Sequence, residues 1–220
     1  FPEIINPYFE ESLFKKARAK KLLSVYVHDL RDFAEDKHCT VDDKPFGGGL
    51  GMVMSVQPWY KAVKKISRAK ISGKKLMPDK GIKIIMLTPR GRQFNQKMAQ
   101  KLVRAKQIIF ICGRYEGVDE RVAQYIATSK VSIGGYDLMG GELAAMVIAE
   151  TVARLIPGVI GKPEFLKTRL SQKGFFESAQ YTRPAIFSPA ANVQWRVPKV
   201  LLSGDPKKIS AWRQAHGKII

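Results

Sequence analysis

The sequence has few of the residues that bind metal ions. Its 220 residues include two cysteines, Cys39 and Cys112, and three histidines, all scattered along the chain. Neither residue type has the spacing of metal ligands, so we expect no structural metal site. Two distant thiols without a disulfide pattern are typical of a cytoplasmic protein.

The sequence also lacks long apolar runs and a secretory signal. Its apolar segments are much shorter than the roughly 20 residues that a membrane helix needs. The N-terminus has no basic start followed by an apolar core, so a signal peptide is not expected either. The chain does not begin with Met, and Phe1-Pro2-Glu3 indicates a cut inside a longer chain.

Acidic residues are scarce, with 19 Asp and Glu against 38 Lys and Arg, and the formal net charge is +19. The imbalance is concentrated in two blocks. Residues 61–110 carry 15 basic residues and 1 acidic residue, and residues 161–220 carry 11 and 3. Clustered positive charge is typical of proteins that bind nucleic acid, although a solvated helix face can have the same composition. We expect a nucleic-acid partner whose affinity falls steeply with salt.

What the sequence does contain is a series of apolar runs that alternate with helical patterns. Residues 82–87, 108–111 and 131–133 are predicted to be strands, because each is a short apolar run followed by turn residues. Strands that alternate with helices predict an α/β fold with a mostly parallel sheet. Helices are expected at residues 3–21, 57–70, 94–105, 142–155 and 206–215, the last capped by Asp205.

The pattern also predicts how the chain is divided. Residues 1–160 are expected to form the α/β domain, with an additional strand at 22–30 and a flexible basic insertion at 67–80. Residues 161–173 are polar and basic, which is typical of a linker. Residues 174–220 are expected to form a small, mainly helical unit, whose core is thin because so few residues contribute to it.

Two of the predicted strands end in glycine-rich turns. The first is followed by residues 112–117, CGRYEG, and the second by residues 134–142, GGYDLMGGE. Glycine lets the backbone approach a ligand closely, and ligands of open α/β sheets bind beyond the carboxyl ends of the strands. The same pattern fits two tight turns with no ligand, so the residues alone leave both interpretations open.

Seven strings occur in a fixed order along the chain: TVDDKPFGGGLGM (40–52), CGRYEGVDER (112–121), SIGGY (132–136), GGEL (140–143), RLIPGV (154–159), YTRP (181–184) and LLSG (201–204). Together they resemble the bacterial tRNA (guanine-37-N1)-methyltransferases, the TrmD family of the SPOUT class. The resemblance implies an α/β methyltransferase domain with a deep trefoil knot, working as a cytoplasmic homodimer. It also implies that a first strand is missing before Phe1 and that the C-terminal domain is cut short after Ile220.

The resemblance further implies a reaction and its partners. S-adenosyl-L-methionine is the expected cofactor, and the anticodon stem-loop of tRNA is the expected partner. Arg154 matches the family's arginine that stabilises charge on guanine O6; a cation that complements the helix dipole is the other interpretation. The position of the family's catalytic Asp is occupied by Arg169. The remaining carboxylates to consider are Glu164, Glu177, Asp42 and Asp43, and Glu164 is the candidate base because it lies in the same linker. A tRNA-binding relative without methyl transfer is therefore the alternative hypothesis.

The remaining site residues are assigned by position in the family. The RNA-binding residues are expected to be Asp42, Lys44, Tyr181 and Arg183. Glu116 suits the positive amino group or sulfonium of the cofactor, but a salt bridge to Arg114 or Arg121 would explain it equally. The cofactor-binding residues are expected to be Leu87, Thr88, Gly113, Tyr115, Glu116, Gly117, Ile133, Gly134, Gly135, Tyr136, Asp137, Leu138, Gly140 and Gly141.

Overall fold

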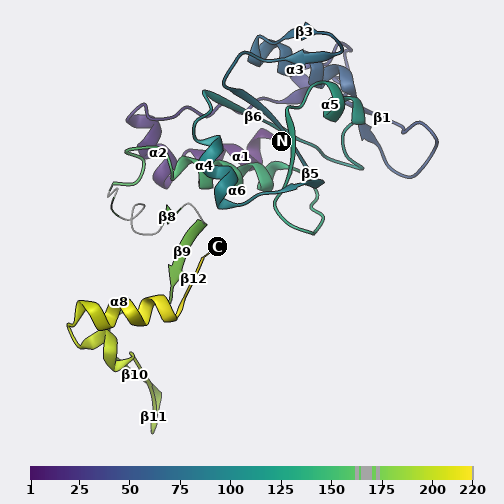
Figure 1. The fold of residues 1–220 in the computed structure, drawn as a ribbon. Helices are drawn as coiled ribbons and strands as arrows, with labels where there is room; N and C mark the ends of the chain where they lie inside the picture. The colour runs from purple at the N-terminus through teal and green to yellow at the C-terminus, as the bar shows by residue number, and fades with distance from the viewer. Residues whose placement is uncertain (162–163, 165–169, 172–173, 220) are drawn as a thin grey trace. The chain divides into compact units, whose positions relative to one another are not determined.

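The computed structural model describes residues 1–161, 164, 170–171 and 174–219. The chain divides into two compact units, Phe1–Pro163 and Glu164–Ile220, and each is described by itself (Figure 1). None of the described helices is both long enough and apolar enough to cross a membrane.

A three-stranded parallel sheet forms the centre of the first unit (Figure 1). The middle strand is β5 (Ile82–Gln93), which pairs with β6 (Gln107–Cys112) on one side and β7 (Ser129–Ser132) on the other. All three lie where apolar runs predict strands. The predicted α/β fold with a parallel sheet is thereby confirmed.

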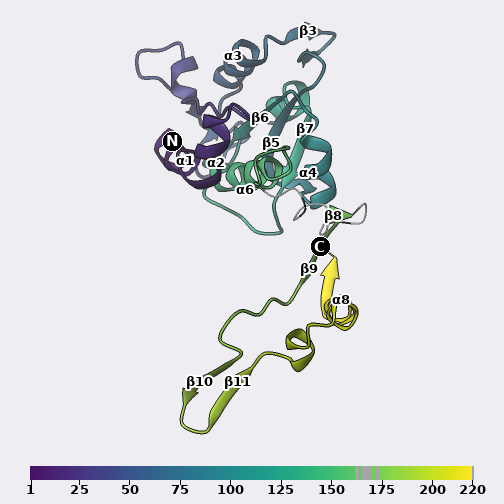
Figure 2. The ribbon, with the colours of Figure 1, turned by 90° about the vertical axis from the view of Figure 1, so that its left-hand side faces the viewer.

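Helices cover both faces of this sheet (Figure 2). On one face lie α3 (Val56–Ser67) and α5 (Glu120–Tyr125). On the other lie α4 (Gln96–Leu102) and α6 (Glu142–Ala153). Of these helices, α3, α4 and α6 agree with the predicted ones in position, with ends that differ by a few residues.

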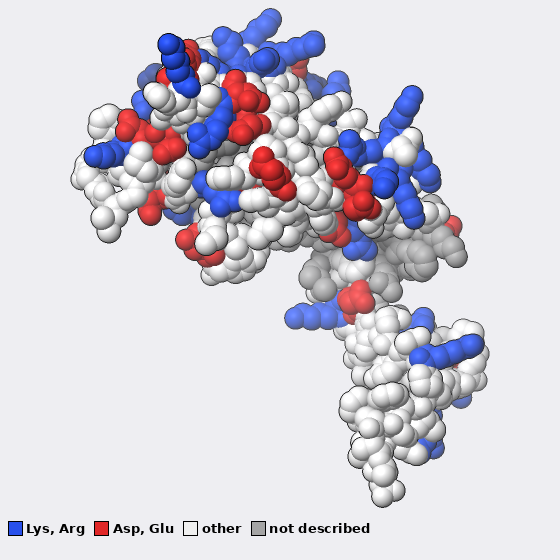
Figure 3. All heavy atoms as spheres, turned by 180° about the vertical axis from the view of Figure 1, so that it is seen from behind, with Lys and Arg blue, Asp and Glu red and all other residues white. Residues whose placement is uncertain are grey.

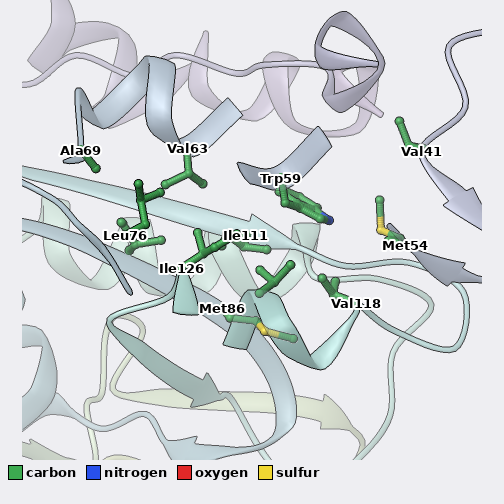
Figure 4. Packing of buried hydrophobic residues seen from close by; sticks show 12 residues of the cluster. Val41, Met54, Trp59, Val63, Ala69, Leu76, Met86, Ile111, Val118 and Ile126 are labelled. Atoms are coloured by element: carbon green, nitrogen blue, oxygen red, sulfur yellow. The ribbon is translucent and has the colours of Figure 1, made fainter. Parts of the chain in front are cut away.

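Each face of β5 contributes to its own hydrophobic core. Ile84 and Met86 pack against α3 and α5, in the cluster that includes Trp59 (Figure 4). Ile85 and Leu87 point to the opposite face and pack against α4 and α6. Successive strand residues alternate between faces, so a strand that is buried on both sides is a continuous apolar run. This is why residues 82–87 are recognisable as a strand.

The helix expected at residues 3–21 is two helices, α1 (Pro2–Phe9) and α2 (Ser12–Ala19). The chain turns between them, where Ser12 has a φ of 52°. The turn brings Phe9 and Phe14 edge to face, with 4.7 Å between their ring centroids. Both rings are buried against α6. The break therefore serves packing, which helical periodicity alone does not reveal.

The strand predicted at residues 22–30 is wrong. The described residues there pair with no other strand, and the segment leads into the 3-10 helix η1 (Leu30–Phe33). Its alternating residues Leu23, Val25 and Val27 pack against the core beside α1 and α2. The alternation of apolar residues correctly indicated that one face of the segment is buried. Helices, rather than a sheet, cover that face.

The basic insertion expected at residues 67–80 is an ordered hairpin. It consists of β3 (Lys70–Ser72) and β4 (Lys75–Met77), joined by a two-residue turn in which Gly73 has a φ of 59°. Leu76, only 3% exposed, anchors the hairpin to the core. One buried residue among lysines is too weak a pattern for a strand prediction.

A shorter antiparallel pair holds the glycine-rich loop of residues 44–52. Its strands are β1 (Asp42–Asp43) and β2 (Val53–Met54). Gly47, Gly48, Gly49 and Gly51 all have positive φ in this loop, a conformation that glycine adopts without steric cost.

The second unit is not mainly helical, which corrects that expectation. Its antiparallel sheet has the order β12-β9-β8, and β10 and β11 form a separate hairpin. Asp205 caps α8 as predicted, because its Oδ1 accepts hydrogen bonds from the amides of Lys207 and Lys208 at 3.0 and 3.2 Å. The elements are β8 (Leu170–Ser171), β9 (Gly174–Ser178), β10 (Ile186–Ala190), β11 (Val193–Arg196), η2 (Lys199–Leu202), α8 (Pro206–Ala215) and β12 (Gly217–Ile219).

Candidate functional site

A cavity of about 300 Å³ lies beyond the carboxyl ends of the three parallel strands. Three loops line it, at residues 88–91, 113–117 and 133–141. The first interrupts β5, the second follows β6 and the third follows β7. This edge of a parallel sheet is where α/β proteins bind ligands.

The first loop leaves the sheet and returns within the same strand. Val131 of β7 pairs with both Leu87 and Arg92 of β5, so residues 88–91 bulge out of the ladder. A β-carbon on Gly91 would lie 2.5 Å from the amide nitrogen of Val131. Only glycine permits this close return, which holds Leu87 and Thr88 at the cavity wall.

The second loop is a tight turn that depends on positive φ. Tyr115 has a φ of 59° and Gly117 a φ of 113°, and the amide of Gly117 donates to the carbonyl of Arg114 at 3.1 Å. The amide of Glu116 donates to Met52 at 3.0 Å, which joins the turn to the end of the glycine-rich loop. This places the side chains of Tyr115 and Glu116 at the cavity.

The third loop is fixed at both of its ends. At its start the buried Ser132 hydroxyl accepts a hydrogen bond from the amide of Gly134 at 3.1 Å. The Tyr136 ring covers Gly134, where a β-carbon would lie 2.2 Å from the ring. At its end the amide of Gly141 donates to the carbonyl of Gly113 at 3.0 Å. Backbone of the second and third loops is therefore in direct contact.

An ion pair joins the same two loops beneath the cavity. Nε of Arg114 donates to Oε1 of Glu142 at 2.9 Å, and Glu142 is only 5% exposed. Breaking a buried pair leaves one charge without compensation, at a cost of about 3–5 kcal/mol. Sequence analysis assigned Glu142 no role, because the partners are 28 residues apart and no local spacing connects them.

A buried thiol lies next to this ion pair. Burial raises the pKa of Cys112 to about 12, and the negative charge of Glu142 adds to the increase. The thiol is therefore protonated at physiological pH, when a nucleophilic cysteine would need to be a thiolate. Cys112 thus belongs to the support of the loops rather than to the reacting groups.

Glu116 has no ionic partner among the described residues. Arg114 is paired with Glu142, and Arg121 is paired with Asp119 at 2.7 Å. The hydrogen bond from Arg121 lowers the pKa of the Asp119 carboxyl. Both arginines that would neutralise Glu116 are therefore bound to other carboxylates, and the exposed Glu116 side chain remains available at the cavity.

The cavity contains most of the residues expected to bind the cofactor. All of them line it except Gly135. A β-carbon placed on Gly135 would have no other atom within 4 Å. Glycine at position 135 is thus not required by close packing. The other lining residues lie within or beside the predicted loops, and that position is the signal that would have found them. They are Met86, Pro89, Arg90, Arg114, Val118, Val131, Ser132, Met139 and Ala144.

One catalytic candidate, Arg154, lies away from the cavity, and the other belongs to the second unit. Arg154 is the C-terminal cap of α6. It is twelve residues from Glu142, which at 1.5 Å per residue corresponds to roughly 18 Å along the helix. Arg154 is exposed and does not line the cavity of its own chain. Glu164 is exposed and belongs to the second unit, and Arg169 lies outside the described residues.

The expected RNA-binding residues are shared between the two units. In the first unit Asp42 lies in β1, and Lys44 is the first residue of the glycine-rich loop. In the second unit Tyr181 is half-exposed and lies edge to face with Trp212, and Arg183 is exposed. Within the described part of the chain, no three His, Cys, Asp or Glu residues are grouped as metal ligands.

Residues 1–219 match the family of tRNA (Guanine-1)-methyltransferases, TrmD. The chain belongs to this family. Three similar TrmD relatives are the tRNA (guanine-N(1)-)-methyltransferases of Dehalococcoides mccartyi strain BAV1, Dictyoglomus turgidum and Clostridioides difficile strain 630. They are 43, 46 and 42% identical, over 97% of this chain and 81, 80 and 87% of their own lengths.

Membership of the TrmD family confirms the resemblance carried by the seven strings. Since the family is one of methyltransferases, the cavity at the strand ends is the candidate site for the methyl donor.

Proposed function

We propose that this enzyme transfers a methyl group from S-adenosyl-L-methionine to N1 of guanosine 37 in tRNA, in the cytoplasm. The observation that carries the proposal is the cavity of about 300 Å³ formed by backbone-exposing loops in a TrmD-family chain. An adenosine requires apolar walls and a few backbone donors and acceptors. Ile133, Tyr136 and Leu138 supply such walls, and the glycines leave backbone accessible.

The charges at the cavity also suit this ligand. When bound, S-adenosyl-L-methionine supplies an electrophilic methyl group on a positively charged sulfur and also carries a positive amino group. Glu116 and Asp137 place two carboxylates at the cavity. Since Glu116 has no ionic partner among the described residues, we assign it to the cationic part of the ligand.

The chemistry requires a base and a cation. Guanine N1 carries a proton at neutral pH, and that proton must leave as the N1–methyl bond forms and the sulfur–methyl bond breaks. We assign the acceptance of this proton to Glu164. We assign Arg154 to guanine O6, where a nearby cation stabilises the developing negative charge.

The distance of Arg154 from its own cavity indicates that a second copy completes the site. On α6, Leu143 and Val147 are 53 and 46% exposed. They lie four residues apart, on one face of the helix. Ile4 of the adjacent α1 is exposed as well. An apolar surface of this kind fits an isologous dimer. We propose a homodimer in which Arg154 of one copy serves the cavity of the other.

The deep trefoil knot that the family implies is part of the same proposal. The support is the set of backbone hydrogen bonds that join the segments around β5. Its ladder with β7 continues past the loop at 88–91, and the amide of Phe94 donates to the carbonyl of Ser132 at 2.7 Å. The amide of Gly141 then joins the third loop to Gly113.

The test of the function is methyl transfer from labelled S-adenosyl-L-methionine to tRNA that carries G37. The matched control is the same tRNA with A37, which should receive no label. We expect Arg154→Ala and Glu164→Gln each to reduce the rate by about 10²-fold or more, as for a general base or an oxyanion-stabilising group. Tight tRNA binding without any transfer would reject catalysis in favour of a binding protein.

The cofactor assignment has its own measurement, by calorimetric titration. Glu116→Gln should weaken binding of S-adenosyl-L-methionine about tenfold, because a charge-assisted contact is lost. Binding of adenosine, which has neither the sulfonium nor the amino group, should not change. Glu35→Gln is the matched control, since the exposed Glu35 pairs with Lys61 and neither residue lines the cavity. An equal loss for both ligands would reject the role of Glu116.

A further inference from the structure

A cationic surface lies at the opposite edge of the parallel sheet from the cavity. It consists of the last turn of α3, the β3–β4 hairpin and the turns that precede β5 and β6. Figure 3 shows Lys and Arg side chains gathered along the α3 and β3 edge of the first unit. We call this surface the hairpin patch; its exposed cations are Lys64, Arg68, Lys70, Lys74, Lys75, Lys80 and Lys106.

The fold brings these residues together at the amino ends of the strands. The amide of Lys106, just before β6, donates to the carbonyl of Gly81, just before β5, at 2.9 Å. The Lys106 stem also packs over Gly81, within 3.0 Å of a β-carbon placed there. In Figure 4, Ala69 and Leu76 of the hairpin region lie at the other end of the core from Val41 and Met54.

The patch is therefore separate from the cavity. The lining of the cavity begins on β5 at Met86, and Ile82 begins β5 at the patch edge. At about 3.3 Å per residue, these two positions are roughly 13 Å apart along the strand. A nucleotide held in the cavity does not extend to the hairpin, so a ligand on the patch must be a different segment or a different molecule.

The charges of the patch are not neutralised within the described chain. None of its seven cations forms an ion pair with a described residue. Lys61 of α3 is excluded from the patch because Glu35 pairs with it. Asp79 is the one acidic residue within residues 61–110. Seven exposed cations without compensation repel one another and favour a polyanion.

We propose that the hairpin patch binds the phosphate backbone of an RNA segment outside the anticodon stem-loop. The charge pattern points to a polyanion, and the choice of RNA rests on the proposed function. Backbone contacts of this kind neutralise phosphates, release counterions and do not depend on base sequence. The source is either the remainder of the substrate tRNA or a second RNA.

The experiment compares two triple variants that remove the same charge. The first changes Lys70, Lys74 and Lys75 to Gln in the hairpin. The second changes Lys15 and Lys16 on α2 and Lys20 at its C-terminal cap to Gln, outside the patch. Dissociation constants are measured over a salt series for three probes: a blunt RNA duplex without loops, a full-length tRNA with G37, and the isolated anticodon stem-loop of that tRNA. Thermal unfolding of each variant confirms that it is folded.

We expect the hairpin triple variant to bind the duplex on the order of tenfold more weakly, with a salt slope reduced by about 2 to 3. The duplex affinity of the α2 triple variant should fall far less, and both variants should bind the stem-loop with the affinity of the wild type. Weaker binding of full-length tRNA would identify the substrate as the source; loss with the duplex alone would identify a second RNA. If the two variants lost duplex affinity equally, or if neither lost any, the proposal would be overturned.

Methyl transfer to the stem-loop separates this inference from the proposed function. The hairpin triple variant should methylate G37 of the stem-loop at the wild-type rate. If the wild type itself methylates nothing, the proposed function fails while duplex binding still tests the patch. If transfer is normal and duplex binding does not depend on the hairpin, only the patch is rejected.

Discussion

Two glycines of one loop show how differently the site constrains its residues. A β-carbon on Gly141 would lie 2.8 Å from the α-carbon of Cys112 and 3.3 Å from the amide nitrogen of Gly113. Both neighbours are backbone atoms, so no side chain can rotate away. Gly135 has open space around it. The two positions thus form a matched pair for substitution.

We predict that Gly141→Ala separates the second and third loops and breaks the hydrogen bond to Gly113. Its free energy of unfolding should fall by about 1–3 kcal/mol, as for other overpacked sites. Affinity for S-adenosyl-L-methionine should fall about tenfold or more. Gly135→Ala should leave both quantities unchanged. Urea denaturation and calorimetry measure them, and equal behaviour of the two variants would contradict the account of this loop.

The two cysteines should differ in reactivity for an electrostatic reason. Because burial raises the pKa of Cys112 to about 12, its reactive thiolate is scarce until the pH approaches that value. Cys39 is exposed. A thiol reagent at pH 8 should therefore modify one cysteine in the folded protein and two after unfolding. Cys39→Ser should abolish the native reaction; rapid labelling of that variant would show that Cys112 is accessible.

At the scale of elements, sequence patterns predicted what local physics determines. β5 is recognisable because it is buried on both faces, β6 because its apolar residues pack toward both cores, and α8 because Asp205 caps it. The break at Ser12 and the unpaired segment at 22–30 depend on what packs against them. The β3–β4 hairpin has too little buried surface to leave a pattern.

In the site, too, local patterns predicted some features, and others depend on contacts between distant segments. Glycine-rich turns after apolar runs indicated the loops around the cavity, because close backbone approach requires glycine. The Arg114–Glu142 pair was not predictable, since its partners meet only when two loops are joined. The open space at Gly135 was not predictable either. Only its position in the family assigned Gly135 to the cofactor.

The cap of α8 gives a prediction for the second unit. Asp205→Ala removes the acceptor for two backbone amides and should cost about 1 kcal/mol. Asp205→Asn keeps a capping oxygen and should cost much less. The midpoint of thermal unfolding, followed by circular dichroism, compares the two. Because α8 and the cavity belong to different units, binding of S-adenosyl-L-methionine should be unaffected in both; a lower affinity would show that the cap does more than hold the helix.

For the whole molecule, the question is whether one chain holds a complete site. The cavity is at the N-terminal end of α6, and Arg154 is at the other end of the same helix. Apolar side chains exposed between them mark the surface that a second copy would cover. Leu143→Glu together with Val147→Glu should therefore yield monomers in analytical ultracentrifugation. These monomers should bind S-adenosyl-L-methionine but methylate no tRNA.

Mixing two inactive variants tests directly whether the site is shared. Gly141→Ala impairs the cavity, and Arg154→Ala removes the cation. In a mixed dimer, the intact cavity of the Arg154→Ala copy lies beside the intact arginine of the Gly141→Ala copy. Random re-association should then restore about a quarter of the wild-type rate, since half of the dimers are mixed and each has one complete site. If Arg154 served its own cavity, the mixture would be no more active than its components.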